Sequence, residues 1–185
     1  MPRFYPNLVT TARLAAPAEQ LSAVRILRES NLPEHWAVKD SFSALDLAPL
    51  GFDLLFEARW IRKDAAPDLA THSRLRWGRT TEGNRLLPPA LFADSDIAMF
   101  TGSRDGEVVA GGIANRSENV VGLSNVFTQV GGAVSVWTDL AALAAVTFPG
   151  LPLVGYETGD DLAAACDSGF QMGDPLRVWA RAVES

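Results

Sequence analysis

The chain has 185 residues, 48% of them hydrophobic, so it is long enough and apolar enough to bury one core. Its formal net charge is −6 at pH 7 and it has no long run of like charges, which argues against a nucleic-acid partner or an anionic membrane surface. A single cysteine, Cys166, excludes an intramolecular disulfide, and neither His35 nor His72 has a second metal ligand near it in sequence. Because the N-terminus lacks a signal-peptide pattern and no apolar stretch is long enough to span a bilayer, we expect a cytoplasmic, metal-free protein.

The first half of the chain contains one predicted helix, one predicted strand and a polar segment. Residues 17–30 carry apolar side chains at helical spacing behind a proline that suits a first turn, which predicts a helix. Residues 51–62 are rich in aromatic and apolar side chains, which predicts a strand. Residues 67–84 are polar and rich in arginine, so they predict a weak helix or a linker, and Pro88-Pro89 ends that segment.

The second half is more regular and begins with three predicted strands. Residues 97–101 and 107–114 are two runs typical of strands, and Asp105-Gly106 between them favours a hairpin turn. After a polar break, residues 120–128 form the third predicted strand. A three-stranded meander is the simplest arrangement of these runs.

Two helices and two strands are predicted to follow. An alanine- and leucine-rich helix starts near Ser135 or Thr138, and residues 151–156 form an apolar strand. Residues 158–161 fit a capping box, and the helix that they open ends at Gly169; residues 176–181 complete the order β-β-β-α-β-α-β. This order predicts an α/β (α+β) fold with a mixed, mostly antiparallel sheet flanked by helices.

A change of character near residue 95 predicts a division into an N-terminal segment, 1–95, and a core domain, 96–185. A Gly-Phe pair followed by Trp and Arg occurs within residues 51–62 and again within residues 169–181. Two interpretations are open: the N-terminal segment is a remnant of a duplicated domain, or two ordinary strands use the same residue types.

Three segments of the core domain, residues 106–112, 121–127 and 161–170, resemble in order and residue type the GNAT superfamily of acyl-CoA-dependent N-acetyltransferases. The resemblance covers the last 90 residues and rests on the order of the elements, because no single motif in it is specific. It implies a GNAT-like sheet in which strand 120–128 splays from its neighbour, with the pantetheine arm of acetyl-CoA, the co-substrate, in the gap. The loop that follows would bind the pyrophosphate with backbone N–H groups at a helix N-terminus.

The resemblance assigns coenzyme binding to the end of that strand and the next loop: Val126, Phe127, Thr128, Gln129, Gly131, Gly132 and Ala133. The family's loop pattern is kept at its first glutamine and first glycine, but Val134 occupies the last small position. Two adjacent glycines would allow the backbone to approach a phosphate closely. A flexible turn that needs two glycines explains them equally well.

Charge and the catalytic positions depart from the family. Residues 117–176 contain no Lys or Arg, so cations for the phosphates would come from Arg104, Arg116 or Arg177, each of which could equally be a solvated surface residue. The family's general-acid tyrosine corresponds to Ala165, and the Asn that usually opens this helix is replaced. The neighbouring Cys166 fits core packing better than catalysis.

Four polar residues remain as candidates for the chemistry. Glu157, at the end of strand 151–156, could deprotonate an ammonium group, or it could favour the next helix by its charge. Tyr156 could replace the missing acid, or it could be a buried tyrosine bonded to the backbone. Ser124 and Asn125 could bind the thioester carbonyl or a substrate hydroxyl, or they could be polar side chains on a half-exposed sheet face.

The sequence thus leaves three hypotheses about function. The first is an acyl-CoA-dependent N-acetyltransferase that acts on a small-molecule amine of unknown identity. The second is a non-catalytic GNAT-like protein that binds a ligand or a partner and has lost coenzyme binding. The third is a GNAT-like homodimer in which the N-terminal segment completes the sheet.

Overall fold

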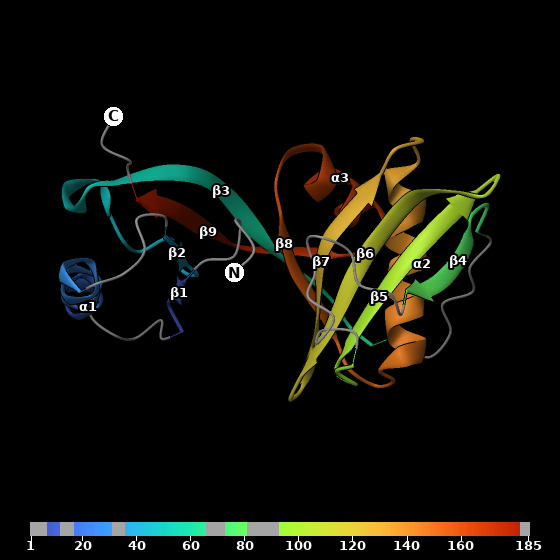
Figure 1. Cartoon of the computed structure of the whole chain (residues 1–185), viewed down its shortest axis with the longest axis horizontal. Coiled ribbons are helices and arrows are strands. Elements are labelled where there is room, and N and C mark those ends of the chain that lie inside the picture. Colours follow the sequence, from blue (N-terminus) through green and yellow to red (C-terminus); the bar gives the residue numbers. More distant parts are fainter. Residues whose placement is uncertain (1–6, 12–16, 31–35, 66–72, 81–92, 182–185) are drawn as a thin grey trace. The chain divides into compact units, whose positions relative to one another are not determined.

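The computed structural model describes residues 7–11, 17–30, 36–65, 73–80 and 93–181 (Figure 1). The helices are α1 (Pro17–Glu29), α2 (Ala133–Thr147) and α3 (Gly159–Asp167), with a short 3-10 helix at Ala48–Leu50. The strands are β1 (Leu8–Val9), β2 (Ala37–Asp40), β3 (Phe52–Lys63), β4 (Arg76–Thr80), β5 (Ile97–Arg104), β6 (Glu107–Ser117), β7 (Val120–Thr128), β8 (Leu153–Glu157) and β9 (Gln171–Arg181). They form a mixed sheet in the order β1-β2-β9-β3-β8-β7-β6-β5-β4, which confirms the predicted fold class.

The chain divides into two compact units. One contains residues 1–59 and 174–185, and the other contains residues 60–173; strands β3 and β9 contribute to both. This division differs from the predicted boundary near residue 95, and the duplication of the N-terminal segment remains a prediction. In the described part of the chain, no helix is long and apolar enough to cross a membrane.

The smaller unit has its own core beneath α1. Val24 of this helix is buried, and the ring of Trp36 meets that of Phe52 edge to face at 4.9 Å between centroids. Asp40, the last residue of β2, is fully buried and accepts a hydrogen bond from the backbone N–H of Leu45 at 2.8 Å. The carboxylate thereby provides a hydrogen-bond acceptor for the backbone N–H of Leu45, which the turn would otherwise leave unpaired.

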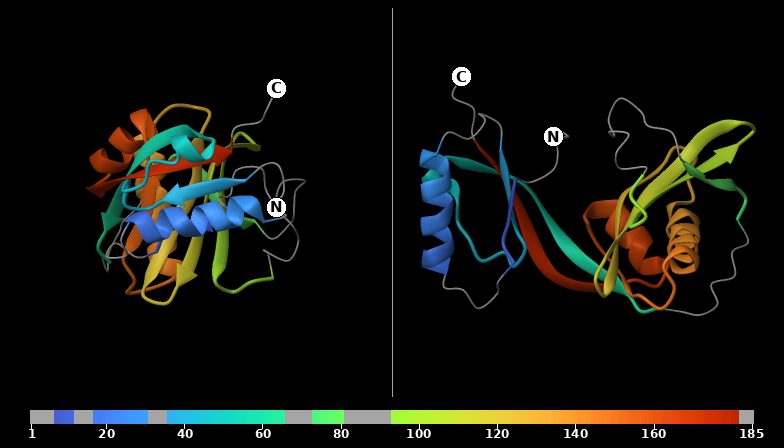
Figure 2. Two further views of the ribbon diagram at one scale, coloured as in Figure 1. Left: turned by 90° about the vertical axis from the view of Figure 1, so that its left-hand side faces the viewer. Right: turned by 60° about the horizontal axis from the view of Figure 1, so that its bottom comes forward.

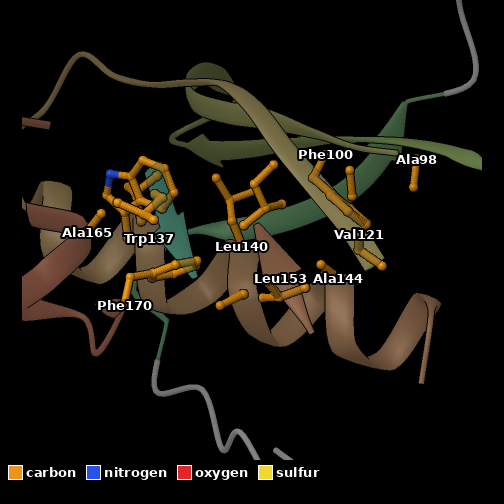
Figure 3. Close-up of a cluster of buried hydrophobic side chains, with 14 of the residues drawn as sticks. Ala98, Phe100, Val121, Trp137, Leu140, Ala144, Leu153, Ala165 and Phe170 are labelled. Atoms are coloured by element: carbon orange, nitrogen blue, oxygen red, sulfur yellow. The ribbon is translucent and has the colours of Figure 1, made fainter. Parts of the chain in front are cut away.

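The larger unit is built around α2, which is apolar on nearly all sides, as expected of a helix that is covered on several faces. Figure 3 shows its side chains Trp137, Leu140 and Ala144 in one cluster with residues of the sheet and of α3. Gly112 of β6 permits this contact, because a Cβ at that position would lie 2.8 Å from Cδ1 of Leu140. Helices α2 and α3 lie side by side within this unit (Figure 2).

The order of elements predicted for the second half is confirmed. The hairpin between β5 and β6 turns at Asp105 and Gly106, whose φ angles of 54° and 88° are the positive values of a tight hairpin turn. Helix α2 begins earlier than predicted, at Ala133. The capping box was wrong, since Thr158 makes no side-chain hydrogen bond to the start of α3.

The prediction of a helix or linker for residues 67–84 was wrong where the structure describes them. Residues 76–80 form an edge strand, β4, that pairs antiparallel with β5, and Trp77 lies opposite Gly102. The apolar pattern is weak because Trp77 is the only large apolar residue within the strand, and its indole lies over the surface that Gly102 leaves free. Pro88-Pro89 lies outside the described residues.

Candidate functional site

Strand β7 contains a bulge. Its pairing with β6 shifts register between Gly111 and Ile113, and Asn125 in β7 has a φ of 52°. With β8 it pairs in parallel over Val121–Gly122 and Leu153–Val154, although both strands continue beyond these residues and are fully described. An extra residue bends a strand and interrupts its ladder. The backbone therefore leaves the later part of β7 unpaired with β8, in agreement with the splaying that the family resemblance implies.

The turn from β7 into α2 leaves the helix N-terminus available to a ligand. Gly131 and Gly132 have φ angles of 69° and 75°. Gly132 occupies the N-cap position, and no side chain makes a capping hydrogen bond to the start of the helix. These left-handed conformations favour glycine. The first backbone N–H groups of a helix have no partner within the helix, and together with the helix dipole they favour an anion.

A pocket of about 750 Å³ opens at this turn. Its lining residues come from the turn and the first part of α2, from the segment before β4 and from the end of β5. It is lined by Ser73, Arg74, Leu75, Arg104, Val130, Gly131, Gly132, Val134, Ser135, Val136, Thr138 and Asp139. The pocket therefore combines an uncapped helix end with two exposed guanidinium groups.

The cations of the pocket come from outside the stretch that lacks them. Of the three arginines that the sequence singled out, Arg104 lines the pocket. Arg116 instead donates from Nε to Asp96 at 2.9 Å, and Arg177 donates to Glu57 at 2.7 Å. Arg74 was missed, because it belongs to the arginine-rich segment that was interpreted as a helix or linker.

A buried carboxylate fixes the wall that carries Arg74. Asp139 of α2 is only 4% exposed and accepts hydrogen bonds from Oγ of Ser73 at 2.5 Å and from Nε1 of Trp77 at 2.9 Å. Ser73 Oγ in turn accepts the backbone N–H of Leu75 at 3.1 Å. These bonds attach the segment before β4 to α2, and they place Arg74 at the pocket.

Replacing Asp139 by alanine is expected to lower the free energy of unfolding by about 2–3 kcal/mol, because the hydroxyl of Ser73 and the indole N–H of Trp77 would both lose a charged acceptor at a half-buried position. Urea denaturation followed by circular dichroism measures the change. The Asp139→Asn variant keeps an acceptor oxygen, so its free energy of unfolding should lie between those of wild type and Asp139→Ala. Glu107→Ala, which removes an exposed carboxylate in β6, should change stability by less than about 0.5 kcal/mol. Equal stability of Asp139→Ala and wild type would show that the cluster does not hold the two elements together.

The proposed base lies at the end of β8. Glu157 is half-buried, and burial, with a smaller contribution from the charge of Asp161, raises its pKa to about 7. Tyr156 packs edge to face on Trp60, with 5.7 Å between ring centroids. Successive side chains of a strand point to opposite faces. Glu157 thus shares the face of the buried Leu153, whereas Tyr156 points to the other face.

The other predicted residues follow β7 in order. Ser124 is half-buried, Asn125 is exposed at the bulge, and the side chain of Val126 lies near Gly112. The ring of Phe127 covers Gly111, where a Cβ would lie only 2.6 Å from it, and remains 42% exposed.

In the loop itself, the hydroxyl of Thr128 donates to the carbonyl oxygen of Gly131 at 3.3 Å. The backbone N–H of Gln129 donates to Val109 at 2.8 Å and continues the pairing with β6. Ala133 opens α2 and is half-buried. Among the predicted coenzyme residues, Gly131 and Gly132 line the pocket, and the others adjoin it in the chain.

The position of the family's acid carries no hydroxyl group. Ala165 is completely buried in the cluster that includes Trp137 and Phe170 (Figure 3). Cys166, next to it on α3, is half-buried. A proton donor for the leaving group cannot come from residue 165.

No protein-family model and no curated protein matches the sequence. Solved structures do resemble this one. A GCN5-related N-acetyltransferase from Kribbella flavida superposes with a TM-score of 0.64 at 13% identity, over 98% of this chain and 80% of that one. A conserved protein of unknown function from Staphylococcus epidermidis gives a TM-score of 0.65 at 7% identity, over 95% and 84% of the chains.

A GCN5-related N-acetyltransferase-like protein from Streptococcus suis gives a TM-score of 0.55 at 15% identity, over 86% of this chain and 75% of that one. At such low identities a likeness concerns the fold. It agrees with the mixed sheet and three helices described above. The chain has the fold of the GCN5-related N-acetyltransferases of the GNAT superfamily.

Proposed function

We propose that the chain is an N-acetyltransferase that transfers an acetyl group from acetyl-CoA to a small-molecule amine. The observation that carries this proposal is the pocket at the uncapped N-terminus of α2, with Arg74 and Arg104 on its walls. Coenzyme A carries several phosphate charges, and helix N–H groups and guanidinium groups are the donors that suit them. The residues present therefore fit the coenzyme, although the stretch around the turn contains no cation of its own.

In this proposal Glu157 accepts the proton of the ammonium form of the acceptor, directly or through water. A pKa of about 7 suits a general base, since an appreciable fraction is ionised at neutral pH while the group remains basic. A backbone N–H in the bulged segment of residues 124–127 donates to the thioester carbonyl oxygen as negative charge develops there. The neutral amine then attacks the thioester carbonyl carbon, the carbon–sulfur bond breaks as the thiolate of coenzyme A leaves, and the nitrogen gives its extra proton to solvent as the amide forms.

Tyr156 remains the candidate for protonating the thiolate, because Ala165 cannot. Its phenol lies on the face of β8 opposite to Glu157, so the base and the acid would act from different sides of the strand. Ser124 and Asn125 are proposed to contact the acyl carbonyl or the acceptor, since they precede and form the bulge.

Titration with acetyl-CoA tests the proposal. A ligand that binds only the native state stabilises it by RT ln(1 + [L]/Kd), which is about 2.7 kcal/mol at one hundred times Kd. The melting temperature should therefore rise by several degrees at saturating acetyl-CoA, and adenosine, which lacks the phosphates and the arm, should have no such effect. No rise at millimolar acetyl-CoA would overturn the proposal. Release of free thiol in the presence of a panel of amines then identifies the acceptor.

A second candidate is a non-catalytic GNAT-like protein that binds a ligand or a partner. The buried Ala165 at the position of the family's acid favours it. Under this reading, acetyl-CoA would either fail to bind, or bind without thiol release for any amine tested.

A further inference from the structure

The indole N–H of Trp137 is the feature of the larger unit that the core packing leaves unexplained. The side chain is 0% exposed, and among the described residues Nε1 has no hydrogen-bond acceptor. Buried donors are nearly always paired, and an unpaired one costs about 1–3 kcal/mol. Burial of the Trp137 N–H therefore costs free energy, and no hydrogen bond within the described part of the chain offsets that cost.

This donor lies at the junction of the elements that form the candidate site. Val136 and Thr138 on either side of it line the pocket, whereas Trp137 itself points into the core. Its ring meets that of Phe170 edge to face at 5.4 Å between centroids, and Ala165 belongs to the same cluster. In Figure 3 the indole nitrogen of Trp137 lies on the side of the ring toward Ala165.

The incomplete pairing of the neighbouring strands β7 and β8 suggests that a ligand supplies the missing acceptor. Helix α2 packs on both β7 and β8, whose mutual pairing extends no further than Gly122 and Val154. An arm inserted between the later parts of these strands would run close to α2, because α2 packs on both of them. Its carbonyl or thiolate groups are acceptors, and the indole N–H is a donor only.

We propose that the N–H of Trp137 binds an acceptor atom on the acyl-pantetheine arm of the co-substrate, beside the position where Ala165 replaces the family's acid. The inference rests on the proposed function and assigns to Trp137 a role in binding the arm. Indole does not release its proton at neutral pH, so Trp137 holds and polarises the arm and transfers no proton. The unpaired donor of the free protein is then satisfied when the arm binds.

The Trp137→Phe substitution removes the N–H and keeps an aromatic ring. Isothermal titration calorimetry would compare wild type and variant with acetyl-CoA, with coenzyme A, and with adenosine 3′,5′-bisphosphate, which has the phosphates of the nucleotide but no pantetheine arm. We expect roughly tenfold weaker binding of the two arm-bearing ligands and unchanged binding of the bisphosphate. The melting temperature of the free variant should not fall through loss of a hydrogen bond, because the wild-type donor has no partner to lose.

The outcomes separate this inference from the proposed function. Wild type that binds none of the three ligands would overturn the proposed function and this inference with it. Wild type that binds acetyl-CoA while Trp137→Phe binds it equally well would overturn the inference alone, as would a variant equally weakened toward all three.

A spectroscopic measurement on wild type covers the case in which the variant does not fold. The indole N–H resonance of Trp137 should move on addition of acetyl-CoA and stay in place on addition of the bisphosphate. It is assigned by elimination with single phenylalanine substitutions of the other tryptophans, Trp36, Trp60, Trp77 and Trp179. A resonance that does not move with acetyl-CoA bound would overturn the inference.

Discussion

Replacing Glu157 by glutamine is expected to lower kcat/KM by roughly a hundredfold or more, the usual contribution of a general base. Glutamine keeps the size of the side chain and removes only its capacity to accept the proton. In wild type the rate should rise with pH through about 7, where Glu157 loses its proton. Initial rates of thiol release between about pH 5.5 and pH 9 would show both effects.

Asp161 provides a matched control for the origin of this profile. Burial is the larger cause of the raised pKa of Glu157, and the charge of Asp161 is the smaller one. Asp161→Asn should therefore move the acidic limb of the profile to lower pH without abolishing activity, while Asp160→Asn, next to it in the first turn of α3, should shift it less. A profile that is the same in wild type and Glu157→Gln would exclude Glu157 as the base.

The Glu157→Gln substitution, which should lower activity, is expected to raise the free energy of unfolding above pH 7. Burial holds the pKa of Glu157 at about 7, above its ordinary value of 4.5, so the folded chain keeps a proton that the unfolded chain has lost between these two values. The contribution of Glu157 to stability therefore falls as pH rises through this window. Glu157→Gln should be more stable than wild type at about pH 8, with the difference shrinking toward about pH 4. An inactive variant that is also less stable at pH 8 would indicate a structural role.

Replacing both Arg74 and Arg104 by alanine is expected to weaken acetyl-CoA binding roughly 10- to 100-fold. Each guanidinium group can donate charge-assisted hydrogen bonds to phosphate, and both residues line the pocket together with the start of α2. Both side chains are exposed, so the substitutions should leave the unfolding free energy nearly unchanged. Calorimetric titration at two salt concentrations should also show a weaker salt dependence in the double variant, because two ionic contacts are gone.

Arg62→Ala serves as the control for this pair. Arg62 belongs to the same unit, is exposed, and pairs with Asp64 at 2.8 Å. Neither Arg62 nor Asp64 lines the pocket. Removal of Arg62 makes the net charge of −6 more negative by the same amount as removal of either pocket arginine, and it does not change a residue that lines the pocket. Equal weakening by Arg62→Ala and by the single substitutions Arg74→Ala and Arg104→Ala would mean that overall charge, and not the pocket, attracts the coenzyme.

The elements of the second half could be predicted because their signals are local. Asp105-Gly106 encodes its own turn, and the apolar run of β8 and the alanine-rich α2 show their periodicity within a few residues. β4 could not be predicted, because Trp77 is accommodated by Gly102 in a strand far along the chain. The capping box failed for a related reason: the residue types were present, but Thr158 does not turn its hydroxyl toward the helix.

By itself, the sequence determined the order of strands and helices in the core domain, the glycine turn before α2 and the absence of a tyrosine at residue 165. Those features depend on residue type and on neighbours in the chain. Only the tertiary structure decided that Arg74 joins Arg104 at the pocket, that Asp139 fixes the segment carrying Arg74, and that the N–H of Trp137 is buried without a partner among the described residues. Burial, and the pairing of groups far apart in sequence, arise when elements pack together, so no local pattern encodes them.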